Sequence, residues 1–359
     1  MKTALIHYWL VNDRGGEKVV AELVRLFPEA DLFTHVYDPS AVPESIRRLN
    51  IRTTFIQKLP FAKKLYKNYL PLMPLALWRL DLSGYDLIIS SESGPAKGIR
   101  KPKGAVHICY CHTPMRYLWD LSDEYAQNAS ILQKLGMKLL RSPLRKWDVW
   151  SASQVDHFIA NSQFVADRIK RIYNREATVI YPPVDTEHFA AIKRDPQDFY
   201  LFFGQLTAYK RADLAVQAFN RLGKRLVVAG TGECFQTLEK MAGPNIEFLG
   251  RVSDEQRDEL YSQAKALVFP GIEDFGIIPV EAQAAGCPVI AFRAGGALET
   301  VIENETGVFF DEPTEDSLIN AVCLFEKLEF NGSACRINAA RFSAEQFVRA
   351  IHSFISRFV

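Results

Sequence analysis

The chain has 359 residues, and its 43 Lys and Arg against 42 Asp and Glu give a formal net charge of +1. This balance excludes an obligate nucleic-acid ligand held by a global positive field. The length exceeds what one hydrophobic core usually supports, so we expect two domains of similar size.

The amino-terminal segment has neither a long apolar stretch nor a small-residue cleavage site, so we expect no signal peptide. No run approaches the roughly 18 apolar residues of a membrane-spanning helix. Six cysteines are scattered without the spacing of a disulfide framework, as is typical of a reducing compartment. The sequence therefore predicts a cytoplasmic protein with reduced thiols.

Apolar runs of strand length alternate with segments of helical period along most of the chain. The predicted strands are 3–9, 86–90, 105–110, 156–160, 177–181, 199–203, 225–229, 246–249, 266–270 and 288–292. The predicted helices are 16–27, 144–153, 162–172, 211–221, 254–263, 279–285, 314–327 and 343–357. Such alternation is typical of the α/β class, with doubly wound, Rossmann-like parallel sheets.

The alternation is interrupted at Pro182 and Pro183, and a polar stretch follows as far as Asp198. We therefore expect a first Rossmann-like domain over 1–185, a second over 186–342, and a last helix over 343–359 that crosses back toward the first. Ligands of open parallel sheets bind at the carboxyl ends of the strands, so two facing domains would enclose a cleft.

The most informative segment runs from Glu273 to Glu281, two carboxylates eight residues apart. Pro279 is a favoured first helical residue, which predicts a helix starting there with Glu281 in its first turn. The free amides before it would form a phosphate site, and Gly276 would allow close approach. Carboxylates beside a phosphate need neutral partners, such as a ribose and a sugar. The alternative is a helix-dipole charge and a solvated loop residue.

Other loops at predicted strand ends carry suitable groups. Gly15 and Gly16 precede a helix and would admit a diphosphate, although a glycine pair there is a weak signal and an ordinary strand-helix turn is the alternative. His112 follows a strand and precedes a proline, a position where functional side chains concentrate. The nearby Cys109 and Cys111 lack a second ligand pair at metal spacing, so we interpret them as sheet packing.

In the second half, Lys210 and Arg211 precede a predicted helix, where cations oppose the helix dipole. A bound diphosphate would neutralise them, whereas solvated side chains are the alternative. Arg251 and Val252 end a further strand, where backbone groups could hold a base.

Together these segments resemble the retaining glycosyltransferases of family four, which have the GT-B architecture, over nearly the whole chain. The resemblance depends on the E-x7-E spacing, with support from residues 15–16, 160–162, 181–185, 204–210, 249–251, 285–289 and 295–296. It implies an acceptor-binding first domain and a second domain that binds a nucleotide sugar.

The resemblance also implies roles for individual residues. Glu281 would bind the ribose, Lys210 would neutralise phosphate, and His112 would face the donor sugar. Glu273 would position the sugar without attacking it, and the diphosphate would meet the amides of Phe275, Gly276, Ile277 and Ile278. Family members commonly have an arginine at the position of Gln205, a departure for which Arg211 is the candidate compensation.

The first-half segment 112–120 and the segment 209–213 resemble bacterial mannosyltransferases of surface polysaccharide assembly, which implies GDP-mannose as the donor. The implied scheme needs no metal, cofactor or protein nucleophile, because the leaving phosphate takes the acceptor proton. Alternatives are a UDP-sugar donor, an epimerase or phosphorylase of the same architecture, and a non-catalytic nucleotide-sugar binder.

The implied acceptor is a lipid-linked or growing glycan. Two basic, partly apolar segments, 58–69 and 134–150, suit an anionic membrane surface, so peripheral attachment to the inner face of the cell membrane is expected. Ordinary amphipathic helices with a solvated face are the alternative.

Overall fold

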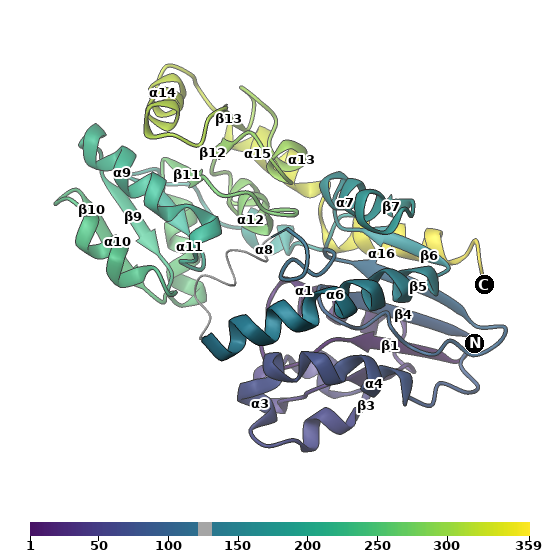
Figure 1. Ribbon diagram of the computed structural model, residues 1–359. Helices are drawn as coiled ribbons and strands as arrows, with labels where there is room; N and C mark the ends of the chain where they lie inside the picture. The colour runs from purple at the N-terminus through teal and green to yellow at the C-terminus, as the bar shows by residue number, and fades with distance from the viewer. Residues whose placement is uncertain (121–130) are drawn as a thin grey trace. The chain divides into compact units, whose positions relative to one another are not determined.

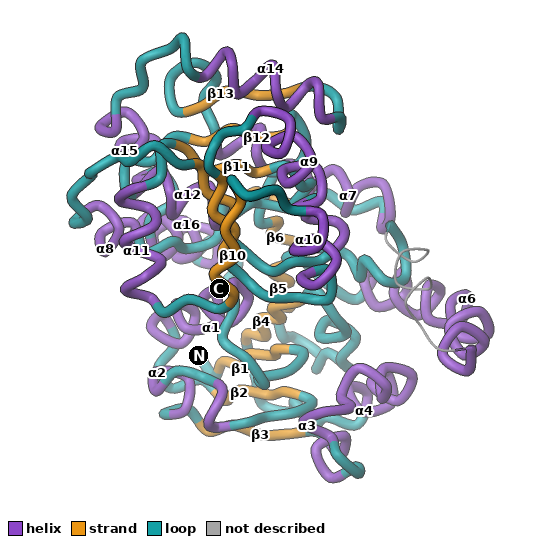
Figure 2. Tube along the Cα trace, turned by 90° about the vertical axis from the view of Figure 1, so that its left-hand side faces the viewer, coloured by secondary structure: helices purple, strands orange, loops and turns teal. Residues whose placement is uncertain are grey.

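The computed structural model describes residues 1–120 and 131–359, with side chains described over 1–120 and 139–359. The chain divides into unit 1, Met1–Pro182 with Phe347–Val359, and unit 2, Pro183–Gln346. Each unit contains one sheet of parallel strands with helices on both faces (Figure 1 and Figure 2). The predicted α/β class with two parallel-sheet domains is confirmed.

The sheet of unit 1 has seven strands in the order β3-β2-β1-β4-β5-β6-β7. Their bounds are β1 Thr3–His7, β2 Asp31–Thr34, β3 Asn50–Thr53, β4 Leu87–Glu92, β5 Val106–Cys111, β6 His157–Ala160 and β7 Ala177–Val179. The helices of unit 1 are α1 Gly15–Leu26, α2 Glu44–Arg47, α3 Ala62–Leu65, α4 Met73–Trp78, α6 Ile131–Ser153, α7 Gln163–Tyr173 and α16 Ala344–Ile355, with 3₁₀ turns η1 Pro39–Ala41, η2 Phe55–Lys58 and η3 Tyr66–Leu72.

Strand β5 shows how this sheet is buried on both faces. Ile108 and Tyr110 belong to a core with α1 and α16, whereas Cys109 and Cys111 belong to a core with α6 and α7. Alternate residues of a strand point to opposite faces, so both faces require apolar side chains. The interpretation of the two cysteines as sheet packing agrees with their complete burial.

Unit 2 contains a six-stranded sheet in the order β10-β9-β8-β11-β12-β13. Its strands are β8 Tyr200–Phe203, β9 Leu226–Ala229, β10 Ile246–Gly250, β11 Ala266–Phe269, β12 Val289–Phe292 and β13 Gly307–Phe310. The helices are α8 Thr186–Ala190, α9 Ala212–Leu222, α10 Phe235–Met241, α11 Asp254–Gln263, α12 Ile277–Ala284, α13 Ala297–Thr300, α14 Glu315–Phe325 and α15 Gly332–Ala340, with the 3₁₀ turn η4 Ala208–Lys210. Helices α9, α10 and α14 share one core against this sheet.

Some predicted elements differ from the structure. The helix predicted at 144–153 is the second half of α6, which continues through Pro143 because one proline removes only one helical hydrogen bond. Strands β2, β3 and β13 were not predicted. In β3, Asn50, Arg52 and Thr53 are exposed because the strand lies at the sheet edge, so it lacks the apolar run of a central strand.

The last helix, α16, begins at Ala344 in unit 2, and its residues from Phe347 onward belong to unit 1. Phe347, Ile351 and Phe354 are buried in the same core as α1. In Figure 2, α1 and α16 lie on one side of the row of unit 1 strands, with α3, α4 and α6 on the other.

Candidate functional site

In unit 2, the loops that follow β8, β9, β10, β11 and β12 meet at one edge of the sheet, because the strands are parallel and their carboxyl ends share that edge. The site residues predicted in the second half are all on these loops or on the turns and helix that follow them. They are Gln205, Lys210, Arg211, Arg251, Val252, Glu273, Phe275, Gly276, Ile277, Ile278 and Glu281.

Two glycines bring these loops together. A Cβ at Gly271 would lie 2.7 Å from the Cα of Lys210, and a Cβ at Gly296 would lie 2.2 Å from the carbonyl oxygen of Phe275. Neither position has room for a side chain. The loops after β8, β11 and β12 therefore touch through their backbones, which holds the residues on them at short range.

Lys210 and Glu273 form the central contact of this edge. The Lys210 Nζ lies 2.7 Å from Glu273 Oε1, and the two side chains are 13% and 19% exposed. The same carboxylate oxygen has no partner with hydrogen-bond geometry. The contact is thus an ion pair in a largely shielded position, with one acceptor oxygen not engaged in an aligned hydrogen bond.

Helix α12 starts earlier than predicted. It begins at Ile277, with Gly276 as its N-cap at φ +89°, so Pro279 is the third helical residue and Glu281 lies beyond the first turn. Glycine adopts this left-handed backbone conformation at little energetic cost, so the helix can begin directly after Gly276. Pro279 is tolerated there because the first amides of a helix have no intrahelical acceptor.

The amides of Ile277 and Ile278 are therefore the free amides at the positive end of α12. Gly204 lies beside them, since a Cβ there would be 3.1 Å from Ile278 Cδ1 and 3.4 Å from Lys210 Nζ. Lys210 and the start of α12 thus flank the same glycine, an arrangement suited to a phosphate group.

Glu281 is buried, at 5% exposure, and its Oε2 accepts a hydrogen bond from the Tyr261 hydroxyl at 3.2 Å. Burial and the adjacent carboxylate hold the pKa of Tyr261 well above its usual value, so the phenol keeps its proton and donates. Since Glu281 lies beyond the first turn, a helix-dipole role explains it poorly. A buried carboxylate fixed by a phenol can accept hydroxyl hydrogens from a ligand.

The remaining predicted residues of unit 2 lie nearer the surface. Gln205 and Arg251 are exposed, and Val252 is half-buried before the capped start of α11. Arg211 is the N-cap of α9, and its Nε donates to Asp213 at 3.1 Å.

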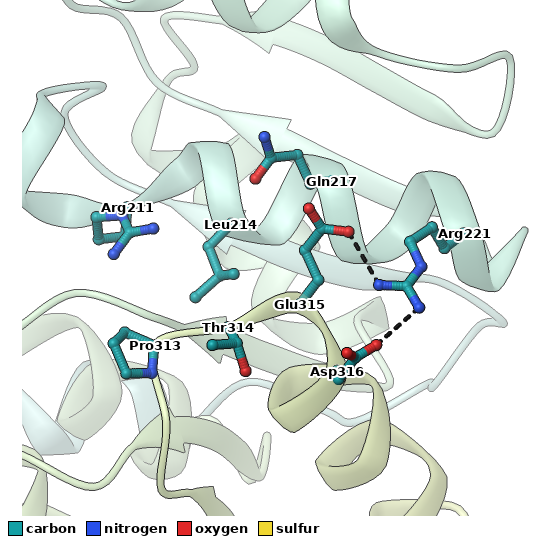
Figure 3. A pocket seen from close by; sticks show the side chains of 8 residues that line it. All are labelled: Arg211, Leu214, Gln217, Arg221, Pro313, Thr314, Glu315 and Asp316. Atoms are coloured by element: carbon teal, nitrogen blue, oxygen red, sulfur yellow. Dashed lines mark hydrogen bonds and ion pairs between the residues drawn. The ribbon is translucent and has the colours of Figure 1, made fainter.

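Arg211 also lines an open cavity of about 360 Å³ between α9 and the start of α14, which Figure 3 shows. The cavity is also bordered by Arg221, which pairs with Glu315 at 3.0 Å and Asp316 at 2.7 Å. Neither Lys210 nor Glu273 lines it. Arg211 therefore contacts Asp213 and lines this cavity, away from Lys210 and Glu273.

In unit 1, Gly15 and Gly16 are the first residues of α1, and His112 directly follows β5. The structure brings Gly16 and His112 together, because a Cβ at Gly16 would lie 3.7 Å from His112 Nε2. The His112 ring is half-buried and lies edge-on to Tyr110 at 5.2 Å. Burial, and then the neighbouring His7 ring, lower the pKa of His112 to about 3.

The sequence did not predict three polar residues beside His112. These are His7 at the end of β1, Ser91 on β4 and Glu17 on α1, each 2% exposed or less. His7 and Ser91 are register partners on adjacent strands, although 84 positions separate them. The sequence signal for this group was His7, a histidine at the end of an apolar first strand. Its partners could be found only from the order of the strands in the sheet.

Among the described residues, no group of three or more His, Cys, Asp or Glu side chains is placed to hold a metal ion. No helix in this part of the chain is long and apolar enough to cross a membrane. The six cysteines all carry free thiols.

Comparison with known families gives two matches that together span most of the chain. The family described as "Glycosyltransferase Family 4" matches residues 14–188, and that described as "Glycosyl transferases group 1" matches residues 183–342. Among curated proteins, the chain is similar to "Alpha-1,3/1,6-mannosyltransferase ALG2" of Mus musculus, with 26% identity over 341 residues that cover 81% of this chain and 79% of the relative.

Solved structures with the same fold have lower sequence identity. The apo form of the lipopolysaccharide outer core galactosyltransferase WaaB matches with a TM-score of 0.72 at 15% identity, covering 100% of both chains. Anabaena HepE in complex with UDP and glucose matches with a TM-score of 0.70 at 17% identity, covering 99% of this chain and 100% of HepE.

Proposed function

We propose, since this chain belongs to the glycosyltransferases of group 1 and family 4 and has the GT-B fold, that it transfers mannose from GDP-mannose to a lipid-linked or growing glycan in polysaccharide biosynthesis. The observation that carries the donor site is the Lys210–Glu273 pair beside the start of α12, with the buried Glu281 on that helix. The mannosyl donor is supported by the name of the ALG2 relatives.

The proposed donor site assigns the diphosphate to Lys210 and the amides of residues 275–278. Breaking the bond between the sugar and the diphosphate leaves negative charge on the leaving group. A fixed cation and oriented amides stabilise that charge most when they need not reorganise. Glu281 accepts hydrogen bonds from the ribose hydroxyls, and Gln205, Arg251 and Val252 border the nucleotide.

Glu273 has two successive partners in this proposal. In the structure it pairs with Lys210 at 2.7 Å. When the diphosphate takes Lys210, the Glu273 carboxylate accepts hydroxyl hydrogens of the sugar and so positions it. His112 is assigned to a hydroxyl of the same sugar. The transfer retains the anomeric configuration, and the leaving phosphate takes the acceptor proton, so this scheme requires neither a protein nucleophile nor a metal.

The donor proposal is tested by calorimetric titration with GDP and UDP side by side, followed by a transfer assay with GDP-mannose. We expect tighter binding of GDP and transfer of mannose that depends on an added glycan acceptor. Preference for UDP would withdraw mannose and favour a UDP-sugar donor, an alternative supported by the fold shared with the UDP complex of HepE. Donor turnover without acceptor would favour an epimerase or phosphorylase, and binding without turnover a non-catalytic binder.

The acceptor proposal includes peripheral contact with an anionic membrane. Phe61 is 74% exposed and lies on the segment 58–69 with the exposed Lys58, Lys63, Lys64 and Lys67. Trp78, at the end of α4, is 54% exposed. Exposed apolar side chains next to cations match the boundary between anionic headgroups and acyl chains.

Helix α6 adds to this surface. Its residues Leu139 and Trp150 are 67% and 48% exposed, and Lys146 is exposed on the same helix. Lys134 and Lys138, which belong to the predicted segment 134–150, lie outside the described side chains. In Figure 2, α3, α4 and α6 lie on the same side of the unit 1 sheet.

Sedimentation with vesicles tests the membrane contact. The full chain should sediment with phosphatidylglycerol vesicles and much less with phosphatidylcholine vesicles. Phe61→Ser with Trp78→Ser should reduce sedimentation, whereas Leu324→Ser, which alters a 43% exposed leucine of unit 2, should leave it unchanged. Equal sedimentation of both variants would contradict the proposed surface.

A further inference from the structure

Four polar side chains form a continuous chain at the carboxyl ends of β1, β4 and β5. The His112 Nε2 lies 2.8 Å from Ser91 Oγ, and the same hydroxyl lies 3.2 Å from His7 Nδ1. On the far side of the ring, His7 Nε2 lies 3.6 Å from Glu17 Oε1, an electrostatic contact without hydrogen-bond geometry. The order is thus Glu17, His7, Ser91 and His112, from the buried end outward.

The sheet register and α1 place these residues on one face. His7 pairs with Ser91, and Ser91 pairs with Tyr110, so all three point to the same side of the sheet. Glu17 faces them from the first turn of α1, where its Oε2 accepts the amide of Arg14 at 3.0 Å. The carboxylate is therefore held in place by the helix start, with its other oxygen directed toward His7.

On the side of α1, Gly16 and Tyr8 lie directly against this chain of contacts. A Cβ at Gly16 would lie 2.9 Å from the Tyr8 hydroxyl and 3.5 Å from His7 Cε1. Burial, and then the nearby Glu17, raise the pKa of Tyr8, so the phenol remains protonated. The polar groups of these contacts are thus one carboxylate, one hydroxyl and one neutral phenol, and the Tyr110 ring lies edge-on to His112.

The Glu17 carboxylate determines which atoms of these side chains donate hydrogen bonds and which accept them. A buried anion beside His7 Nε2 favours the proton on that nitrogen, which leaves Nδ1 as an acceptor. Nδ1 then accepts the Ser91 hydroxyl hydrogen, and the Ser91 oxygen accepts a hydrogen from His112 Nε2. His112 is neutral near pH 7, because its pKa is lowered to about 3. Its second nitrogen, Nδ1, therefore carries a lone pair.

We propose that Glu17, His7 and Ser91 are positioning residues that fix His112 in the Nε2–H tautomer, so that its Nδ1 accepts a hydroxyl hydrogen of the donor sugar. This inference rests on the proposed function, in which His112 faces that sugar. A histidine held in one tautomer and one orientation loses less freedom when the substrate binds, and it presents an acceptor where a hydroxyl donor is needed.

The tautomer is measured directly by long-range ¹H–¹⁵N correlation of the histidine rings in the full chain without substrate, with His112→Gln used to assign the signals. In the wild type, we expect the His112 Nδ1 to resonate as an unprotonated nitrogen and the Nε2 as a protonated one. Glu17→Gln keeps the side-chain shape and an oxygen for the Arg14 amide, but it directs an NH₂ donor toward His7 Nε2. This favours the opposite direction for the two hydrogen bonds of Ser91, to His7 and to His112, so the His112 proton should move to Nδ1.

Ser91→Ala and Ser90→Ala form a matched pair for activity. Ser90 is the neighbouring buried serine on β4, and its hydroxyl contacts the Nε2 of another buried histidine, His107, at 2.9 Å on the other face. We expect Ser91→Ala to lower kcat about tenfold with little change in donor KM. The variant loses the hydrogen bond that orients His112, and the free energy of one hydrogen bond corresponds to about a tenfold change in rate. Ser90→Ala should stay within about twofold of the wild type.

The outcomes separate the inference from the proposed function. An unchanged His112 tautomer in Glu17→Gln, or equal kcat in Ser91→Ala and Ser90→Ala, would overturn the positioning role. Should Glu17→Gln fail to fold, the Ser91→Ala spectrum decides, because loss of a single His112 tautomer supports the inference and retention of it overturns it. The spectra need no substrate. If Glu17→Gln shows the expected tautomer shift but His112→Gln retains wild-type activity, the role of His112 in sugar transfer is refuted instead.

Discussion

Glu273→Gln should tighten the binding of nucleoside diphosphate while slowing sugar transfer. Lys210 Nζ is paired with Glu273 Oε1 at 2.7 Å, so a diphosphate that takes Lys210 must break this pair. The substitution keeps the side-chain shape and removes the competing charge. It also removes the repulsion between that carboxylate and the phosphate, which acts in the same direction.

The magnitude follows from the geometry. At an effective dielectric constant of about 20, two charges 2.7 Å apart attract with about 6 kcal/mol, most of which desolvation offsets. Fully exposed pairs contribute a net of about 0–1 kcal/mol. With side chains 13% and 19% exposed, we expect about 1–2 kcal/mol here, which corresponds to about a 5- to 30-fold gain in GDP affinity.

Isothermal titration of GDP measures this gain. Glu315→Gln is the matched control, because it removes the same charge from an exposed pair with Arg221 beside the cavity of Figure 3. Lys210→Met should weaken GDP binding, and the double variant Lys210→Met with Glu273→Gln should regain little of the lost GDP affinity. Unchanged or weaker GDP binding in Glu273→Gln would refute the exchange of partners. A kcat equal to that of the wild type would refute the positioning role of Glu273.

Three further predictions follow from the described contacts. Glu281→Ala should weaken nucleotide binding, and His112→Ala should slow transfer with nucleotide binding retained; titration and steady-state kinetics would contradict this division if both variants lost binding equally. Lys97→Met should lower the free energy of unfolding by about 3–5 kcal/mol, because the fully buried amine contacts Glu92 at 2.8 Å and Asp148 at 2.5 Å. Urea denaturation measures this free energy. For the control Lys101→Met, whose pair with Asp156 is partly exposed, the free energy of unfolding should fall by only about 0–1 kcal/mol. Gly296→Ala should reduce nucleotide binding in the same titration, because its Cβ would lie 2.2 Å from the Phe275 carbonyl oxygen and must displace the loop before α12.

The Lys97 prediction carries a pH dependence with a definite sign. Burial raises the pKa of Glu92, so the native state binds a proton at this carboxylate more readily than the unfolded chain does. A group whose pKa is raised by folding contributes stability at low pH and loses it as pH rises. In Lys97→Met the compensating cation is absent, so the stability deficit relative to the wild type should shrink as pH falls from about 7 toward 5. A deficit that grows on acidification would contradict this assignment.

The amino-acid sequence by itself determined the α/β class and most of the central strands and major helices. Buried parallel strands require continuous apolar runs, and amphipathic helices require a helical period, so both leave local patterns. The glycine and the two carboxylates of the segment 273–281 are also local, because an N-cap glycine and the following helix act within a few residues. The two basic, partly apolar segments 58–69 and 134–150 are visible in the sequence for the same reason.

The tertiary structure alone decided which of these residues meet. The Lys210–Glu273 pair depends on the contact between loops after β8 and β11, which glycines without room for a Cβ make possible. The chain from Glu17 to His112 depends on β4 lying between β1 and β5, which brings together residues 84 positions apart. Strand order and register arise from the packing of the whole sheet, so no local pattern in the sequence encodes these partners.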